Sequence, residues 1–144
     1  MLTVLMVVLT RSTMSNSEAT KDTAALVDRG QACYATCGLT CYTQSRVKNA
    51  LNQGYNDYVN GNTPHDYPHT YYDRDGFDLL VTGPYLEFPI LHDYRAYTGG
   101  SPGPDRVVFN IRGEYAGAIT HTGASGNKFV QCSRVLHQRT LKTS

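Results

Sequence analysis

Four cysteines constrain what this 144-residue chain can fold into more than any other feature. Cys33, Cys37 and Cys41 lie close together, whereas Cys132 lies far along the sequence. Their spacing differs from the Cys-x2-Cys knuckles and Cys/His pairs of structural zinc sites, so disulfide bonds are the better interpretation. In every possible pairing Cys132 bonds to the first cluster and closes a loop of about 90 residues or more, worth roughly 4–5 kcal/mol in a chain-entropy treatment. The pattern predicts an oxidising compartment and no metal site.

The size and charge of the chain narrow its function classes. Its length suits one domain with a single core. A formal net charge of +1 provides no broad electrostatic field for a polyanion, so contact with nucleic acid must come from local groups in a cleft. The composition argues against a tight, salt-sensitive architectural nucleic-acid binder and is compatible with an enzyme that turns over its substrate.

The two ends of the chain are predicted to lie outside the domain. Residues 2–9 form an apolar run of signal-peptide length that is too short to span a bilayer. No Lys or Arg precedes this run and no clear cleavage site follows it before Arg11, so a buried or disordered apolar N-terminus is the alternative. We expect residues 1–31 to be a signal and pro-peptide-like disordered segment, residues 32–132 the domain, and residues 133–144 a mobile basic tail.

The domain begins with a helical pattern. Thr43 or Ser45 can cap the start of a helix, and Gly61 follows its end. Between these residues apolar side chains recur at three- and four-residue steps, which predicts one amphipathic helix. They are Val47, Ala50, Leu51, Tyr55, Tyr58 and Val59.

Four strand-like patterns follow the helix. Apolar or aromatic residues alternate with polar ones in residues 67–71, 85–91, 106–111 and 115–120, and turn sequences rich in Gly, Pro and Asp separate these segments. One helix packed on a central antiparallel sheet and stapled by disulfides is an α+β fold. The alternating apolar positions are Leu86, Phe88 and Ile90 in the second strand and Val107, Phe109 and Ile111 in the third.

The same alternation gives the expected directions of four polar side chains. If the apolar positions of residues 85–91 face the core beneath the helix, Glu87 faces the opposite, open side of the sheet. Arg106 is turned outward from the next strand in the same way. If the two strands are neighbours, both side chains lie side by side on a concave surface, which His69 and His121 can reach from flanking strands.

A carboxylate, two imidazoles and a guanidinium form a complete set for phosphoryl transfer. In-line cleavage of an RNA backbone requires a base, an acid and fixed positive charge for the phosphorane. Taken alone, Glu87 and the histidines are typical of solvated strand residues, and Arg106 beside Asp105 is typical of a surface pair that contributes little. Their joint presence on predicted open faces, inside the motifs described next, indicates catalysis.

The segments that carry these residues resemble a known family. Tyr-Pro-His at 67–69, Tyr-x-Glu-Phe-Pro-Ile at 85–90, Gly-Gly-Ser-Pro-Gly-x-Asp-Arg-Val-Val at 99–108 and Ile-Thr-His-Thr-Gly-Ala-Ser-Gly-Asn at 119–127 are similar in order and spacing to the small guanyl-specific extracellular ribonucleases of fungi. The resemblance runs from about Cys33 to Cys132. It implies a secreted, metal-independent endoribonuclease without a cofactor, a ribonuclease domain at 32–132, and the disulfides Cys33–Cys41 and Cys37–Cys132.

The resemblance also implies a role for each member of the polar set. Glu87 takes the proton from the ribose 2′-OH, with His69 beside it as electrostatic partner or alternative base. His121 protonates the departing 5′-oxygen, and Arg106 stabilises the pentacoordinate phosphorane. The product is a 2′,3′-cyclic phosphate, which the same pair hydrolyses more slowly to a 3′-phosphate with their roles exchanged.

Other residues are expected to bind the substrate. By resemblance, Tyr67 hydrogen-bonds the phosphate, Phe129 shapes the site, and Asn127 matches a position that contacts the base. The guanine loop of the family usually reads Tyr-Asn-Asn-Tyr-Glu-Gly-Phe, and here it is Tyr71-Tyr72-Asp73-Arg74-Asp75-Gly76-Phe77.

Two positions of this guanine loop depart from the family. Asp75 keeps the carboxylate but is one methylene shorter than Glu, and Arg74 replaces a stacking ring, although a guanidinium plane can also lie on a base. Tyr71 still offers a ring face. We expect a guanosine preference that is retained but weaker than is usual for the family, since losing part of a buried polar pairing costs about 1–3 kcal/mol.

The expected partner is single-stranded RNA, with a monomeric enzyme and no membrane partner. DNA lacks the 2′-OH nucleophile and cannot be cut in this way. One alternative is a non-catalytic ribonuclease-like effector that binds RNA or a host protein, but such proteins typically lose catalytic side chains, and all four are present. A ribosome-directed toxin is disfavoured because that class adds long lysine-rich loops, whereas the connections here are short and the net charge is near zero. A nutritional enzyme and a cytotoxic virulence factor are both compatible with the sequence.

Overall fold

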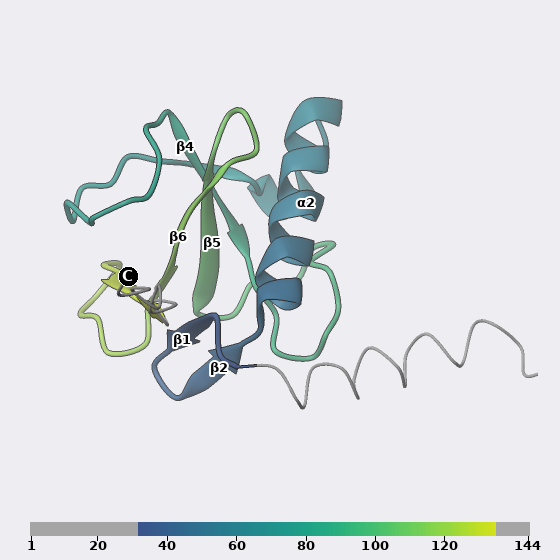
Figure 1. Ribbon diagram of the computed structural model, residues 1–144. Helices are drawn as coiled ribbons and strands as arrows, with labels where there is room; N and C mark the ends of the chain where they lie inside the picture. Colours follow the sequence, from purple (N-terminus) through teal and green to yellow (C-terminus); the bar gives the residue numbers. More distant parts are fainter. Residues whose placement is uncertain (1–31, 135–144) are drawn as a thin grey trace, which may run out of the picture. The chain divides into compact units, whose positions relative to one another are not determined.

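A computed structural model describes residues 32–134. The predicted signal-like segment at 1–31 and the tail residues 135–144 lie outside the described residues. Within 32–134 the chain forms two antiparallel sheets and one long helix, α2, beside the central sheet (Figure 1). The α+β prediction, with one helix on an antiparallel sheet, is confirmed.

The strands form a five-stranded and a three-stranded sheet. The central sheet has the order β3-β4-β5-β6-β7, with β3 at His69–Tyr71, β4 at Tyr85–Pro89, β5 at Asp105–Asn110, β6 at Tyr115–Thr120 and β7 at Val130–Gln131. The smaller sheet has the order β2-β1-β8, with β1 at Ala35–Cys37, β2 at Thr40–Tyr42 and β8 at Ser133–Arg134. A short 3-10 helix, η1, covers Pro64–Asp66 before β3.

Helix α2, Gln44–Asn60, begins and ends where the sequence predicts. The side chain of Thr43 accepts a hydrogen bond of 3.4 Å from the backbone N–H of Arg46 and so caps the first turn. Gly61 ends the helix in the left-handed region, with φ of 70°, which a residue without a Cβ adopts at little cost.

The buried stripe of α2 differs from the predicted one near its C-terminal end. Its buried residues are Val47, Ala50, Leu51, Gly54 and Asp57. Tyr58 and Val59 are 41% and 62% exposed, so their assignment to the apolar stripe was wrong. The helix approaches the sheet most closely at Gly54, where an added Cβ would lie 2.7 Å from the Phe88 ring. Tyr58 lies on the same helix face one turn beyond Gly54, in the last turn of the helix, and Val59 is turned about 100° from Tyr58 around the helix axis.

The main core lies between α2 and the central sheet. Leu86, Phe88 and Ile90 of the β4 segment and Val107 and Phe109 of β5 belong to it, as the alternation predicts. Ile111 does not, and is 41% exposed. β5 ends at Asn110, whose backbone N–H bonds the carbonyl of Glu114 at 3.0 Å, so the chain turns before the alternation reaches Ile111.

The opposite face of the central sheet is less open than the sequence predicts. Glu87 is only 7% exposed and Arg106 only 3%. Residues 77–81 fold back over this face, where the N–H of Leu80 bonds the carbonyl of Ala116 at 2.9 Å. They pack on a second apolar cluster, which lies on the same face of the sheet as Glu87 and Arg106. The buried members of that cluster are Tyr71, Val108, Ala116 and Ile119.

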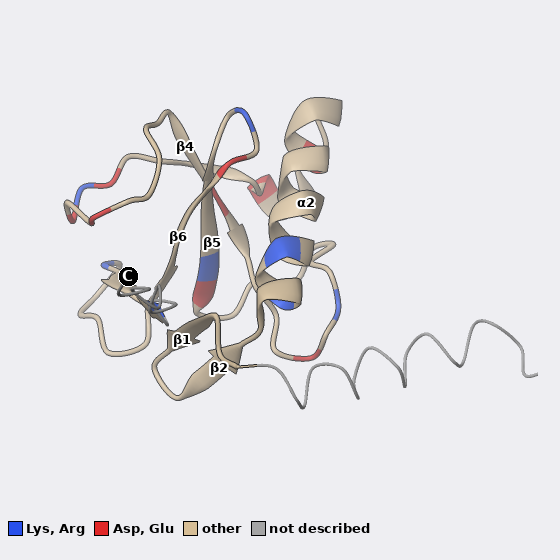
Figure 2. Cartoon of the chain, viewed as in Figure 1, with Lys and Arg blue, Asp and Glu red and all other residues tan. Residues whose placement is uncertain are grey.

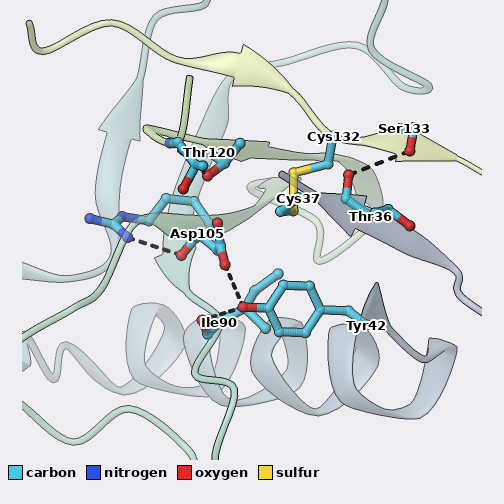
Figure 3. The surroundings of a disulfide bond; sticks show 10 residues. Thr36, Cys37, Tyr42, Ile90, Asp105, Thr120, Cys132 and Ser133 are labelled. Carbon is cyan, nitrogen blue, oxygen red and sulfur yellow. Dashed lines mark hydrogen bonds between the residues drawn. A yellow bond between two sulfur atoms is a disulfide. The ribbon is translucent and has the colours of Figure 1, made fainter. Parts of the chain in front are cut away.

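Two disulfides tie the smaller sheet together. Cys33–Cys41 closes the β1–β2 hairpin, with a sequence separation of 8, and Cys37–Cys132 joins β1 to the end of the central sheet, with a separation of 95. These are the two bonds that the family resemblance implies. Figure 3 shows the second bond near Tyr42 and Asp105.

The domain extends two residues beyond the predicted boundary at Cys132. Ser133 pairs with Thr36 and Arg134 with Ala35, so strand β8 completes the smaller sheet instead of starting a mobile tail. The Ser133 hydroxyl also donates a hydrogen bond of 3.4 Å to the Thr36 carbonyl (Figure 3). The disulfide at Cys132 holds these residues against β1, which explains why a polar sequence forms a strand there.

Candidate active site

The register of the central sheet places the predicted catalytic residues on one face. His69 of β3 lies opposite Glu87 of β4, and Glu87 lies opposite Val108 of β5. Arg106 is two residues from Val108 and therefore faces the same side. His121 directly follows β6, where its backbone N–H bonds the Pro104 carbonyl at 3.0 Å and prolongs the pairing with β5.

His69 and Glu87 are in direct contact. The His69 Nδ1 atom lies 3.3 Å from Oε1 of Glu87, which is an ion pair whenever the imidazole is protonated. The Tyr67 ring stacks on the imidazole with a centroid distance of 4.0 Å and an interplanar angle of 18°. The histidine is thereby held in one orientation beside the carboxylate.

The Glu87 carboxyl has an environment that suits a general base. Burial raises its pKa above the ordinary value, and the nearby charges of Arg106 and His69 act in the opposite direction. Its Oε2 atom is buried and has no hydrogen-bond partner among the described residues. One carboxylate oxygen is therefore oriented by His69, while the other has no hydrogen-bond partner within residues 32–134.

Arg106 is held by backbone carbonyls. Its Nη1 donates hydrogen bonds to the carbonyl oxygens of Pro102 at 3.3 Å, Gly103 at 2.7 Å and Asp105 at 2.9 Å. The guanidinium carbon lies 5.2 Å from the centroid of the Tyr67 ring, within cation–π range. The buried Nε has no partner within residues 32–134. Arg106 is therefore a fixed positive charge, and one of its donors has no partner within residues 32–134.

Asp105 does not form the surface pair with Arg106 that is typical of adjacent opposite charges. It is 2% exposed, and its Oδ2 accepts a hydrogen bond from the hydroxyl of Tyr42, on strand β2 (Figure 3). Figure 2 shows the two charges in succession on β5. Asp105 thus anchors the start of β5 from the core side, while Arg106 faces the catalytic side.

His121 is fixed by a hydrogen bond and by an aromatic ring. Its Nδ1 lies 2.7 Å from the carbonyl oxygen of Lys128. A carbonyl oxygen only accepts, so Nδ1 carries the proton of this bond, and Nε2 is the nitrogen that can exchange a proton with a substrate. Phe129 stacks on the imidazole with a centroid distance of 3.9 Å and an angle of 24°.

The predicted guanine loop is organised by Asp73. This residue has φ of 47°, and its Oδ1 accepts hydrogen bonds from the Tyr71 hydroxyl at 3.3 Å and from the Phe77 N–H at 2.9 Å. Burial raises the pKa of the Tyr71 hydroxyl, and the neighbouring Asp73 carboxylate adds to the rise. Tyr71 is buried in the second apolar cluster, so it presents less free ring surface than the sequence predicts.

The other loop residues are exposed. The guanidinium of Arg74 lies over the Tyr72 ring, 5.7 Å from its centroid. Asp75 accepts a hydrogen bond of 3.4 Å on Oδ2 from the backbone N–H of Phe129. Figure 2 shows acidic residues on both sides of one basic residue in this loop. Asn127 is exposed, and no side-chain hydrogen bond involves it within residues 32–134.

Sequence reasoning missed two tyrosines that support the site. Tyr97 is 1% exposed, lies edge-on to Tyr67 at 5.4 Å, and donates a hydrogen bond of 2.8 Å to the Gly100 carbonyl. It fixes the loop whose carbonyls hold Arg106. Tyr42 anchors Asp105 from the opposite side of the sheet. The only signal for either residue was an aromatic side chain next to a turn or a cysteine, which is too common to be informative.

Neither a metal centre nor a membrane span was found in residues 32–134. No group of three or more His, Cys, Asp or Glu side chains there could hold a metal ion. The helices of this part of the chain are too short or too polar to cross a bilayer.

A buried carboxylate, two imidazoles and a held guanidinium on one sheet face are the groups that acid–base phosphoryl transfer requires. Comparisons with known proteins agree with this class. The chain belongs to the ribonuclease family, whose model matches residues 30–133.

Individual relatives support the same assignment. Guanyl-specific ribonuclease Ms of Aspergillus phoenicis is 57% identical over 103 residues, covering 72% of this chain and 98% of that protein. Extracellular guanyl-specific ribonuclease Fl1 of Gibberella baccata is 54% identical over 101 residues, covering 69% of this chain and 95% of that protein. A solved ribonuclease structure from Hericium erinaceus is similar with a TM-score of 0.53 and 32% identity, covering 71% of this chain and 98% of that one.

Proposed function

We propose that this protein is a secreted, metal-independent endoribonuclease that cleaves single-stranded RNA on the 3′ side of guanosine. The observation that carries the proposal is the contact set around Glu87, which joins it to His69 and places it on the same sheet face as Arg106. Relatives that are 50–58% identical are guanyl-specific ribonucleases, one of them named as extracellular.

In the proposed first step, Glu87 removes the proton from the ribose 2′-OH. The raised pKa makes Glu87 a stronger base than an exposed glutamate, while its unpartnered Oε2 is the oxygen that can receive the proton. His69 stabilises the carboxylate through Oε1 and is the alternative base. The 2′-oxygen then attacks the phosphorus, and a bond to the 5′-oxygen breaks.

His121 completes the step as the general acid. Its Nδ1 proton is engaged by the Lys128 carbonyl, so the proton on Nε2 passes to the departing 5′-oxygen. The product is a 2′,3′-cyclic phosphate. Water then opens this ring to a 3′-phosphate, with His121 as the base and Glu87 as the acid.

Arg106 stabilises the charge that develops on the phosphorane. Its guanidinium is buried and already held by three carbonyls, so little reorganisation is needed when the negative charge appears. Tyr67 contacts both Arg106 and His69 and is the residue that we assign to the phosphate. Because this set supplies a base, an acid and positive charge, the chemistry requires no metal ion or cofactor.

Base choice is assigned to the loop 71–77, with Asn127 and Phe129. The carboxylate of Asp75 is expected to accept hydrogen bonds from the guanine edge. Tyr71, Tyr72, Asp73 and Arg74 are expected to lie around the base. Because aspartate is shorter than glutamate, we propose a guanosine preference weaker than that of a glutamate-containing loop. DNA is not a substrate, since it has no 2′-OH, and we propose that the enzyme acts as a monomer away from membranes.

A cleavage assay tests the proposed function. The purified protein is incubated with RNA in EDTA, and the cut ends are mapped, with a Glu87→Ala variant prepared in parallel as the control for contaminating nucleases. We expect cleavage after guanosine with 2′,3′-cyclic phosphate ends in the parent protein only. Products with 5′-phosphates, or activity abolished by the chelator, would falsify the mechanism. RNA binding without cleavage would favour the non-catalytic alternative, which the four retained catalytic side chains argue against.

A further inference from the structure

One peptide group connects the loop assigned to base recognition with the histidine assigned as general acid. The carbonyl of Lys128 and the N–H of Phe129 belong to the same peptide unit. The oxygen accepts a hydrogen bond of 2.7 Å from His121 Nδ1, and the N–H donates one of 3.4 Å to Asp75 Oδ2. A carboxylate, a peptide group and an imidazole are thus joined in series, although Asp75 and His121 are 46 residues apart in sequence.

Hydrogen bonds in series through an amide strengthen one another. An anionic acceptor on the N–H draws electron density toward the carbonyl oxygen, which then becomes a better acceptor. A better acceptor at Lys128 strengthens the bond from His121 Nδ1 and so holds the imidazole more firmly in one orientation. The Asp75 charge therefore acts on His121 without touching it.

Packing of the Phe129 ring also connects His121 with the guanine loop. The Phe129 ring stacks on His121 at 3.9 Å and lies edge-on to Tyr71 at 6.2 Å and 87°. Because Asp75 holds the backbone N–H of Phe129, it also holds this ring between the imidazole and the guanine loop. Loss of the Asp75 contact would loosen the face on which His121 rests.

We propose that Asp75 is a positioning residue for the general acid, acting on His121 through the peptide group that joins Lys128 to Phe129. This inference rests on the proposed function, in which the same carboxylate also reads guanine. A carboxylate has about four lone-pair positions, so it can accept from the Phe129 N–H and from a base edge together. Base recognition and acid positioning then share one side chain.

The contact can be tested in the free enzyme by NMR. The signals of the His121 Nδ1 proton and the Phe129 amide are compared in the parent protein and in Asp75→Ala, Asp75→Asn and Asp78→Asn variants. Asp78 is an exposed acid nearby whose side chain makes no hydrogen bond within residues 32–134, so it controls for the loss of one charge. We expect both signals to move in Asp75→Ala, to move less in Asp75→Asn, and to stay in place in Asp78→Asn. Signals that are unchanged in Asp75→Ala would overturn the proposal.

Turnover of a substrate that lacks guanine separates positioning from recognition. We expect Asp75→Ala to lower kcat for ApC by about three- to tenfold, the equivalent of one hydrogen bond, with KM little changed. Asp75→Asn should restore part of this loss, because its amide oxygen still accepts from Phe129. A loss confined to GpC would show that Asp75 only recognises the base and would overturn the proposal. If the Asp75 variants show the NMR shifts but the parent protein cuts no RNA, the contact is supported and the proposed function is overturned.

Discussion

The residues assigned to chemistry and those assigned to base choice stand on different kinds of backbone. Glu87 and Arg106 lie on paired neighbouring strands and are 7% and 3% exposed. Arg74 and Asp75 lie on an exposed loop that depends on the hydrogen bonds of one aspartate, Asp73. A sheet fixes side-chain direction through many backbone bonds, whereas a loop relies on few. Changes in this loop can therefore alter base preference without disturbing Glu87 and Arg106 on the sheet, except at Asp75, whose contact with Phe129 extends to His121.

The largest expected effect concerns the two disulfide bonds. Removing Cys37–Cys132 by paired Ser substitutions should lower the free energy of unfolding by roughly 4–5 kcal/mol, because a long loop is no longer closed in the unfolded chain. Removing Cys33–Cys41, which closes a loop of only 8 residues, should cost about 2.5 kcal/mol. Urea unfolding of both variants measures the difference. Equal losses of unfolding free energy in the two variants would mean that loop length does not determine how much each disulfide stabilises the fold.

The next effect compares a strand with the loop directly. Glu87→Ala or His121→Ala should lower the rate of RNA cleavage at least roughly 100-fold, as the loss of a general base or acid does. Arg74→Ala, on the exposed loop, should lower the rate less than about tenfold, since it removes at most one stacking contact. Initial rates on a GpN dinucleotide measure all three. Near-normal activity in both catalytic variants would reassign the site.

The burial of Glu87 also predicts a pH dependence. Burial raises its pKa, and the base must be ionised to work, so kcat/KM should fall with decreasing pH around a midpoint above the ordinary value of about 4.3. Between the ordinary and the raised pKa the folded state binds more protons than the unfolded state, so stability should decrease as pH rises through this window. A Glu87→Gln variant should lack that slope. Rate and unfolding measurements from pH 3.5 to 7 test both signs, and a midpoint below the ordinary value would contradict the role of burial.

The smallest effect concerns base choice on the loop. Asp75→Glu lengthens the carboxylate by one methylene and should increase the preference for GpC over ApC by about fivefold, the equivalent of about 1 kcal/mol. Asp78→Glu, a matched change outside the guanine loop, should leave the ratio unchanged. If GpC and ApC are cut at equal rates by the parent protein, this loop does not read guanine.

The sequence predicts well those features that depend on local periodicity. Alternation alone assigns Leu86 and Phe88 to the core and Glu87 to the other face, and the helix ends follow from Thr43 and Gly61. The polar set could be identified because each member interrupts an apolar pattern, although its assigned roles remain predictions.

Features that depend on the direction of backbone groups or on contacts between distant segments could not be predicted. Three nearby backbone carbonyls hold Arg106, and nothing in the side-chain pattern of residues 102–105 shows where those oxygens point. Residues 77–81 pack on part of the face that carries Glu87 through long-range contacts, which the sequence pattern does not reveal. Strand β8 directly follows Cys132, whose disulfide partner Cys37 lies 95 residues away in sequence, so its pairing with β1 depends on a long-range bond that its own residues do not indicate.

The pairing of Ala35 with Arg134 places the first and last strands of the domain side by side. A short linker could therefore join the two ends without crossing the catalytic face, and the chain could be reopened in an exposed turn such as Gly99–Ser101 or Gly123–Asn127. The first opening cuts the loop that carries the Arg106 carbonyls, and the second cuts the segment between His121 and Phe129. Comparing the activities of the two permuted enzymes would thus show which of these two backbone connections the catalytic geometry requires. No side chain of the site changes in either enzyme.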